Sequence, residues 1–274
     1  MGQNGVTNPK REVARWTLVT SVLGDDTVLR RTLLRSPAID KRCQVIVKRG
    51  YCDVTKAYNA AMAEATNEIV VIAHHDVYLP ASWPARLRRA LDSLSLGDPR
   101  WGVLGVAGIT SQGEFQGHVH STGLKRTLGG PFETPVEAQS FDELLLIIRR
   151  SSELKFDERL PSIHFYGTDI CLQARALKLK SYLIPAFCIH NSNGVKYLSR
   201  AFWQNYFYMR RKWWNDLPVV TCCATITRDA LPIAKQLALT ARDRLMARRE
   251  VGTRTEDPQL LYHELLRSGA AREI

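Results

Sequence analysis

The sequence lacks the features that mark membrane-spanning and disulfide-rich proteins. No stretch approaches the roughly 20 uninterrupted apolar residues of a transmembrane helix, and residues 1–10 lack the apolar segment of a signal peptide. The six cysteines show neither the Cys-x-x-Cys spacing of metal sites nor the density of a disulfide scaffold. We therefore expect reduced thiols and a cytoplasmic protein.

Several common catalytic motifs are also missing. The sequence contains no P-loop, no G-x-G-x-x-G fingerprint, no G-x-S-x-G nucleophile elbow and no H-E-x-x-H zinc motif. P-loop nucleotide hydrolysis, dinucleotide redox chemistry and α/β-hydrolase chemistry therefore lose their usual support.

Acidic residues are scarce in the C-terminal part of the chain. The formal net charge is +11, and residues 196–249 contain eleven Lys and Arg against three Asp and no Glu. Such a surplus indicates an anionic partner, which could be a nucleotide, a nucleic acid or a membrane surface. The composition, 45% hydrophobic and 24% charged, is that of a globular protein.

Residues 13–194 carry the pattern of one α/β domain. Strand-like runs at Trp16–Val22, Cys43–Val47 and Glu68–Ala73 alternate with helical patterns, the clearest of which covers residues 53–65. This alternation predicts βαβ units and a mainly parallel central sheet flanked by helices. Ligands of such sheets bind at the carboxyl ends of the strands.

Further elements are expected in the rest of this domain. The sequence predicts a helix at Pro84–Leu94, a strand at Trp101–Ala107, loops and short strands over 110–135, a buried strand at Phe141–Ile148, a helix from a Thr168 cap to Leu177, and a strand at Ser181–Pro185.

The two ends of the chain are predicted to differ from this domain. Residues 1–12 are polar and aperiodic, as is typical of a flexible tail. Residues 195–274 form a basic, aromatic-rich helical extension, with eight aromatic residues from Tyr197 to Trp214. We favour aromatic packing on the core with solvated charges, although basic aromatic helices can also lie peripherally on anionic lipid. No RNA- or DNA-binding motif supports a nucleic-acid partner.

Polar residues directly follow the apolar run that ends at Ala73. They are His74, His75 and Asp76. Because burying three such groups without partners is costly, a strand-end cleft accounts for them best. His74 and Asp76 lie on the same side of an extended backbone, and an imidazole with a carboxylate suits a divalent ion that also binds a diphosphate. The alternative is that the histidines only cap the strand.

Three further residues are candidates for a site. Asp169 is expected in the first turn of a helix, where the backbone dipole favours a carboxylate, although helix capping is the alternative. His190 ends an apolar strand and could complete a metal site, although a structural hydrogen bond is the commoner role. For His164 we favour acceptor contact or structure over metal binding.

Several motifs occur together in a fixed order. They are Tyr58–Met62, Glu68–Tyr78, Phe141–Glu143, Phe156–Glu158, His164–Asp169 and Ala186–Ser192. This order resembles the glycosyltransferase-like proteins of the streptomycin-biosynthesis type, which belong to the broad family-2-like glycosyltransferases. The resemblance covers roughly residues 16–194. It implies a Rossmann-like fold of the GT-A type and a nucleotide-diphosphate sugar as donor.

The resemblance also implies roles for single residues. It places His74–Asp76 where related enzymes have D-x-D, with Asp76 as a metal ligand and His74 in place of the first aspartate. It makes Asp169 the general base of an inverting reaction and His190 a metal or diphosphate contact. The metal would be Mn2+ or Mg2+.

The same comparison implies contacts with both substrates. The predicted contacts with the nucleotide sugar are Ser21, Val22, Asn59, His75 and Asp76, and the predicted acceptor contacts are His164, Tyr166 and Glu158. The acceptor would be a carbohydrate or a lipid-linked sugar, as in polysaccharide biosynthesis.

These assignments predict a metal-assisted, inverting glycosyltransferase. The ion would stabilise the departing nucleoside diphosphate, and Asp169 would take the proton of the acceptor hydroxyl. Two alternatives stay open. A sugar-phosphate nucleotidyltransferase would need a Gly- and Lys-rich phosphate loop after the first strand, which is missing. A non-catalytic module that binds a sugar or nucleotide is supported by the His74 replacement.

Overall fold

The first third of the chain shows the expected alternation of strands and helices. The computed structural model describes residues 15–246 and 251–272, so the predicted tail at 1–12 lies outside the described residues. Strands β1 (Trp16–Val22), β2 (Gln44–Arg49) and β3 (Ile69–Ala73) pair in parallel in the order β2-β1-β3. The helices α1 (Thr27–Arg31) and α2 (Val54–Glu64) connect them, with a 3-10 turn, η1 (Leu33–Arg35), after α1.

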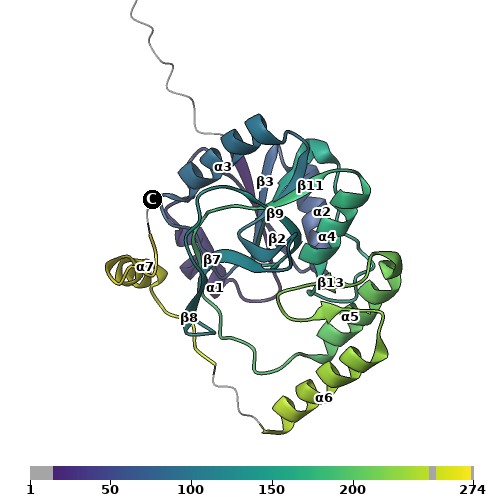
Figure 1. The fold of residues 1–274 in the computed structure, drawn as a ribbon. Helices are drawn as coiled ribbons and strands as arrows, with labels where there is room; N and C mark the ends of the chain where they lie inside the picture. Colours follow the sequence, from purple (N-terminus) through teal and green to yellow (C-terminus); the bar gives the residue numbers. More distant parts are fainter. Residues whose placement is uncertain (1–14, 247–250, 273–274) are drawn as a thin grey trace, which may run out of the picture.

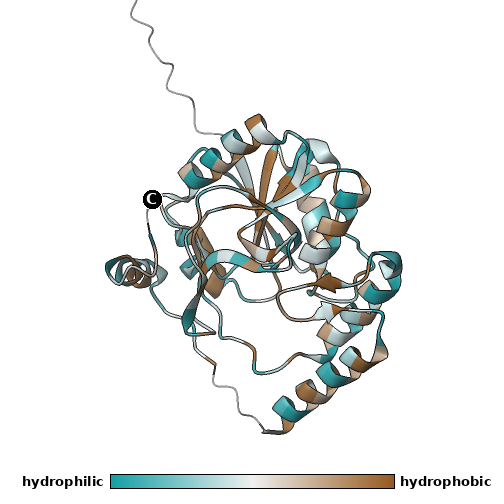
Figure 2. Ribbon diagram, in the orientation of Figure 1, coloured by the Kyte–Doolittle hydropathy of each residue, from teal (hydrophilic) through white to brown (hydrophobic). Residues whose placement is uncertain are grey.

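Strand β3 is buried on both faces of the sheet. Its five residues are all apolar and all buried. Val70 and Ile72 pack in the core beneath α2 and α4 (Tyr166–Ala176), whereas Ile69, Val71 and Ala73 pack in the core beneath α1 and α3 (Trp83–Gly97). The alternation of side chains along a strand therefore gives the fold two apolar layers. Figure 2 shows the apolar central strands between helices with hydrophilic outer faces.

The rest of the sheet is mixed, so the prediction of a mainly parallel sheet is wrong. Strand β10 (Leu145–Arg149) is antiparallel to both β3 and β5 (Trp101–Gly105). The pairs that join β6 (Ala107–Thr110), β7 (Phe115–Ser121), β8 (Arg126–Gly129) and β9 (Val136–Phe141) are also antiparallel. Their connections are too short for the helix that a parallel crossover requires. Strand β11 (Lys180–Leu183) is parallel to β5, and β12 (Cys188–His190) is parallel to β7.

The sheet curls back toward its own beginning. Twelve strands of the described residues form one sheet, in the order β2-β1-β3-β10-β5-β11-β9-β6-β7-β12-β4, with β8 beside β7 and off this path. Strand β4 (Val77–Tyr78) ends this path, although it begins only four residues after β3 ends. Since a chain spans at most about 3.6 Å per residue, the far end of the path must return close to β3 (Figure 1). This closure brings the end of β12 beside the end of β3.

Two predicted boundaries in this region are wrong. The single strand expected over Phe141–Ile148 is divided between β9 and β10, with Asp142 and Glu143 in the turn between them. A continuous strand would carry both carboxylates into the apolar core, which is costly. Helix α4 begins at Tyr166, after Phe165 with a φ of 66°, so Thr168 lies inside the helix and does not cap it.

The C-terminal part of the described chain is mainly helical. Its elements are α5 (Arg200–Lys212), η3 (Trp214–Asp216), β13 (Val219–Val220), β14 (Thr225–Ile226), α6 (Ala230–Met246) and α7 (Pro258–Arg267), and a further short turn, η2 (Arg150–Ser152), follows β10. Phe202, Trp203 and Tyr206 of α5 are buried against the core. Aromatic packing therefore holds α5, as we favoured, while Phe207 and Trp214 stay exposed.

Lys212 ties the end of α5 to the core through two carboxylates. Its Nζ lies 2.7 Å from Asp169 Oδ1 and 2.8 Å from Asp157 Oδ2. Burial alone would raise the pKa of Asp157, but hydrogen bonds from Lys212, Tyr208 and Arg159 hold it below its usual range. The ion pairs of Lys212 with the two carboxylates therefore stabilise the attachment of the C-terminal helices.

We expect Leu146→Ala to lower the free energy of unfolding by about 2–5 kcal/mol, because it opens a cavity around a fully buried side chain of β10. Leu96→Ala on α3 is the control, since Leu96 is 91% exposed and its truncation should change stability by less than about 0.5 kcal/mol. Urea denaturation measures both. Equal effects of the two substitutions would contradict a central position for β10.

We expect Lys212→Met to cost about 3–5 kcal/mol of stability at pH 7, because it leaves the buried Asp169 without a cation and leaves Asp157 with Arg159 as its cation. The control is Arg175→Ala, which breaks a more exposed pair with Asp216 and should cost about 0–1 kcal/mol.

The same variant should show a pH dependence. Because the folded-state pKa of Asp157 is lowered, ionised Asp157 stabilises the folded protein above its unfolded pKa of about 3.9 and loses this effect as the pH falls toward the folded value. The stability difference between wild type and Lys212→Met should therefore shrink from pH 7 to pH 3 in urea titrations. A difference that stays constant with pH would refute the ionic origin of the effect.

Candidate metal site

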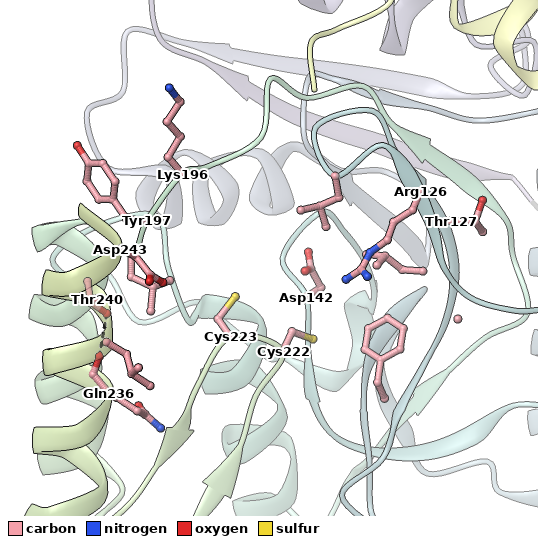
Figure 3. Close-up of a pocket in the computed structure, with 16 residues that line it drawn as sticks. Arg126, Thr127, Asp142, Lys196, Tyr197, Cys222, Cys223, Gln236, Thr240 and Asp243 are labelled. Carbon is pink, nitrogen blue, oxygen red and sulfur yellow. Dashed lines mark hydrogen bonds between the residues drawn. The ribbon is translucent and has the colours of Figure 1, made fainter. Parts of the chain in front are cut away.

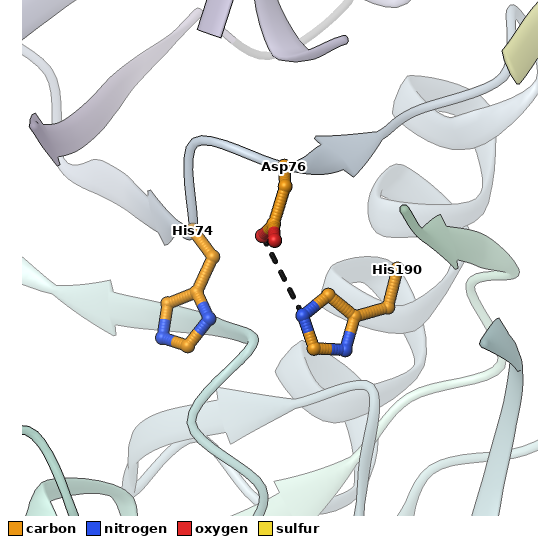
Figure 4. Close-up of side chains that lie close together, drawn as sticks. All are labelled: His74, Asp76 and His190. Carbon is orange, nitrogen blue, oxygen red and sulfur yellow. Dashed lines mark ion pairs between the residues drawn. The ribbon is translucent and has the colours of Figure 1, made fainter. Parts of the chain in front are cut away.

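Three side chains that could hold a metal ion meet where the curled sheet closes. His74 and Asp76 lie in the turn between β3 and β4, and His190 is the last residue of β12. One ligand atom from each lies within 4.8 Å of the others, and Figure 4 shows the three side chains facing a common space. The structure thus brings together the three residues that we predicted as metal ligands.

Local backbone contacts fix the turn that carries these residues. His74 N donates to Leu144 O at 2.9 Å, and Val77 N donates to His74 O at 3.1 Å, which closes the turn. Asn191 N donates to Asp76 O at 2.8 Å. The chain can turn sharply here because polar residues end the apolar β3, and the turn directs two of them toward His190.

The carboxylate of Asp76 is buried and incompletely satisfied. Asp76 is 5% exposed, and its Oδ2 accepts from Arg254 Nη2 at 3.2 Å. Its Oδ1 has no hydrogen bond among the described residues and lies 3.5 Å from His190 Nε2. A buried oxygen of this kind normally has a partner. One carboxylate and two imidazoles therefore fit a divalent cation.

The charges of the cluster favour metal binding. Burial alone would raise the pKa of Asp76, but contact with His190 and the nearby His74 hold it below its usual range, so the carboxylate is ionised. Burial lowers the pKa of His190, yet Asp76 outweighs this and raises it above the ordinary value. His190 now faces the negative charge of Asp76, and a bound cation would neutralise that charge in its place.

Tyr166 holds His74 in the form that a metal ligand needs. Its hydroxyl donates to Glu143 O at 2.8 Å and lies 2.9 Å from His74 Nε2. Since the single tyrosine proton goes to Glu143 O, His74 Nε2 must donate in the other contact, and Nδ1 keeps a free lone pair. Burial lowers the pKa of His74 to about 4, which keeps the ring neutral at pH 7.

The predicted nucleotide-sugar contacts outside the metal cluster lie after β3, at the end of β1 and on α2. His75 is half-buried next to the metal cluster, and Ser21 and Val22 end β1, with Ser21 half-buried and Val22 buried. Asn59 on α2 is engaged by the segment after β10: its side chain bonds both backbone groups of Phe156 at 2.9 Å. Their contacts with a nucleotide sugar stay predictions.

The predicted acceptor contacts do not share one surface. Glu158 is exposed and accepts from Asn59 Nδ2 at 2.9 Å. His164 is half-buried with its ring against Phe202, and Tyr166 is fully buried behind His74. In this conformation Tyr166 offers no surface to an acceptor. All three roles stay predictions.

Asp169, the predicted general base, is enclosed by donors. It is 1% exposed. Besides both contacts from Lys212 Nζ, it accepts from Trp213 Nε1 and from Gln173 Nε2, each at 2.7 Å. An acceptor hydroxyl could reach this carboxylate only if Lys212 and Trp213 moved away, so the role of base stays a prediction.

The structure adds Asp142 to the neighbourhood of the site. Its charge raises the pKa of both His74 and His190, which places it close to the metal cluster. Asp142 also lines a cavity of about 800 Å³ between the β7–β8 hairpin, the Cys222–Cys223 turn and α6 (Figure 3). Asp142 belongs to the motif at 141–143, but the sequence predicted a buried strand there and therefore did not mark Asp142 as a site residue.

The sequence analysis did not identify two other groups near the cluster, Glu143 and Arg254. Burial and the charge of Asp142 raise the pKa of Glu143 to about 8. Arg254, which contacts Asp76, lies 178 positions further along the chain, and no sequence motif predicts this contact.

Within the described ranges, no helix is long and apolar enough to span a bilayer.

Comparison with known proteins gives one partial sequence match. No family model matches the sequence. The chain is 30% identical over 135 residues to a Fuscovulum blasticum protein described as ATP synthase subunits region ORF 6. The match covers 46% of this chain and 52% of that protein, so the chain spans about half the length of this relative.

Solved structures give distant similarities. The chain is similar to the mannosyltransferase PcManGT from Pyrobaculum calidifontis in complex with GDP-Man and Mn2+, with a TM-score of 0.48, 13% identity, and coverage of 96% of this chain and 77% of that chain. For GalNAc-T7 with UDP, GalNAc and Mn2+ the TM-score is 0.48 and the identity 11%, with coverage of 76% of this chain and 52% of that chain. For S. aureus TarS 1–349 the TM-score is 0.48 and the identity 11%, with coverage of 74% of this chain and 66% of that chain. Similarities at this level assign no function to the chain.

Proposed function

We propose that the chain is a glycosyltransferase of the GT-A type that binds a nucleotide-diphosphate sugar with a divalent cation at His74, Asp76 and His190. The observation that carries this proposal is the buried Asp76 Oδ1, which has no hydrogen bond from any residue that the structure describes and lies near two histidines. The cluster lies where β3 and β12 end, the edge at which α/β sheets bind ligands. The ordered motifs in residues 16–194 support the substrate class.

The residues of the cluster would have distinct tasks. Asp76 through Oδ1, His190 and His74 would hold Mn2+ or Mg2+, which supplies Lewis-acid stabilisation for the departing nucleoside diphosphate. Tyr166 keeps the His74 ring in one tautomer and orientation. Contacts with the nucleotide sugar are proposed for His75 and for the three residues beyond the cluster, Ser21, Val22 and Asn59.

Acceptor binding is proposed in the cavity that Asp142 lines. The cavity of about 800 Å³ has the size of ordinary ligand pockets and mixes polar and apolar walls. Asp169 would act as the base of an inverting transfer once Lys212 and Trp213 release its carboxylate, since a base must lie about 3 Å from the hydroxyl oxygen. Acceptor contacts are proposed for His164, Tyr166 and Glu158.

A module that binds a nucleotide sugar without turnover is the second candidate. The enclosed carboxylate of Asp169 favours it, because a base whose lone pairs already accept hydrogen bonds from three side chains is not ready to take a proton. The histidine at position 74, in place of a carboxylate, favours it as well.

We expect one nucleotide-sugar class to raise the melting temperature in the presence of Mn2+. A screen of UDP-, GDP-, CMP- and dTDP-sugars, each with and without Mn2+, measures this, and a ligand at 100 times its Kd adds about 2.7 kcal/mol of stability. Asp76→Asn should abolish the metal-dependent part of the shift. Asp92→Asn on α3, which changes an exposed carboxylate, should respond as wild type does.

Two results decide between the candidates. Release of nucleoside diphosphate with formation of a glycoside of inverted configuration supports the transferase, whereas binding without any turnover supports the module. A lack of stabilisation by all four donor classes would refute both, and retention of configuration would refute Asp169 as the base of an inverting transfer.

We further propose that a lipid-linked acceptor would bring the C-terminal helices to an anionic membrane surface. Leu231 and Leu245 of α6 are 82% and 85% exposed and lie on nearly the same face of the helix. Arg210 stacks over the exposed Trp214 at 4.6 Å. Exposed apolar side chains beside basic ones are typical of helices that lie in a lipid interface.

Sedimentation with vesicles tests this surface. The wild type should bind vesicles that contain phosphatidylglycerol at low salt, bind neutral phosphatidylcholine vesicles weakly, and be released by salt. Replacing Leu231 and Leu245 together by Asn should reduce binding several-fold without lowering stability, because both side chains are exposed. If anionic vesicles fail to retain the wild type, the proposed membrane contact is wrong.

A further inference from the structure

Residues 251–257 run across the edge of the sheet that holds the metal cluster, and we call this segment the C-terminal strap. Gly252 N donates to Gly123 O at 2.8 Å. Thr255 N donates to Asn191 Oδ1 at 2.8 Å, and Asn191 Nδ2 donates back to Thr255 O at 2.9 Å. A Cβ at Gly252 would lie 1.9 Å from Thr122 O, so this position fits only glycine. The strap is therefore fitted closely to the loops that follow β7 and β12.

Helix α7 fixes the end of the strap. Asp257 caps the helix by accepting from two backbone N–H groups of its first turn. Tyr262 packs on Tyr78 and Phe187, with ring centroids at 6.2 and 5.9 Å. His118 Nε2 lies 2.9 Å from Ala270 O, just beyond the helix. These contacts join the strap to β4, to β7 and to the residue before β12, beside the turn and the strand end that carry the metal cluster.

The strap places the guanidinium of Arg254 at the metal cluster. Arg254 N donates to Asn193 Oδ1 at 3.0 Å, its Nε to Asn191 O at 3.0 Å, and its Nη2 to Asp76 Oδ2 at 3.2 Å. The side chain keeps 32% exposure. Nη1 has no acceptor among the described residues, and a guanidinium has five N–H donors in all. Arg254 is thus oriented on one side and open on the other.

The charges at this point call for an anion. A divalent cation and Arg254 would both present positive charge to the open side of the cluster, which favours an anionic ligand. The diphosphate of a nucleotide sugar carries about two negative charges. Arginine also suits phosphate better than lysine does, because its planar fork gives two parallel hydrogen bonds.

We propose that Arg254 binds a phosphate group of the donor diphosphate beside the metal cluster, with the C-terminal strap as the element that positions it. This inference rests on the proposed function, because it adds a residue to the same donor site. It makes the C-terminal strap a part of that site.

Separate titrations of metal and nucleotide test the inference. Isothermal titration with Mn2+ alone comes first, followed by titration with UDP, GDP, CDP and dTDP in saturating Mn2+. Arg254→Met should bind Mn2+ at least as tightly as wild type, because a repelling cation is gone, whereas the Kd of the nucleoside diphosphate that wild type binds should rise about 10- to 100-fold. Arg254→Lys should lie between the two. Arg267→Met, which removes an exposed arginine of α7, should equal wild type.

The outcomes separate this inference from the proposed function. If Arg254→Met binds the nucleoside diphosphate as wild type does, the inference is overturned while the proposed function stands. If Arg254→Met also loses Mn2+, Arg254 only orients Asp76, and the inference is overturned again. If wild type binds no Mn2+ or none of the four nucleotides, both fail. Should Arg254→Met not fold, Arg254→Lys decides, because it keeps the charge and removes only the fork.

Discussion

The pairing of β12 with β4 is the contact on which the candidate site depends. It consists of two residue pairs, Ile189 with Tyr78 and His190 with Val77. These pairs close the curled sheet, and together with the hydrogen bond from Asn191 N to Asp76 O they hold the end of β12 against the turn that follows β3. Without this closure His190 would lie far from His74 and Asp76 along the strand path. The sheet backbone thus holds His190 beside the turn that carries His74 and Asp76.

Two buried aspartates of this chain illustrate how burial by itself says little about role. Asp169 has donors from Lys212, Trp213 and Gln173, which satisfy both of its oxygens and fasten the C-terminal helices to the core. Asp76 has one arginine on Oδ2 and no hydrogen bond on Oδ1 among the described residues. The first arrangement is complete without a ligand. The second leaves Oδ1 open, and a cation at this oxygen would complete it.

The sequence predicted the local elements and part of the site, and it failed where distant segments decide. Apolar runs predicted β1 and β3, and the polar residues directly after β3 predicted a site at His74 and Asp76. Strand direction depends on pairing partners, so the antiparallel β10 could not be read from its apolar residues. Asp142 was hidden inside a run that reads as one strand. Arg254 has no local signal, because only the folded chain brings the strap to Asp76.

The position of the strap has a consequence for the order of synthesis. A ribosome releases β3, β4 and β12 long before Arg254, so a nascent chain can form the sheet while Asp76 Oδ2 has no arginine beside it. The charge pair forms only after residue 254 has emerged. A product that stops after α6 would keep the strands and the three candidate ligands, yet it would hold a buried carboxylate with one cation fewer. Translation must therefore pass the strap before this edge of the sheet acquires the charge of Arg254.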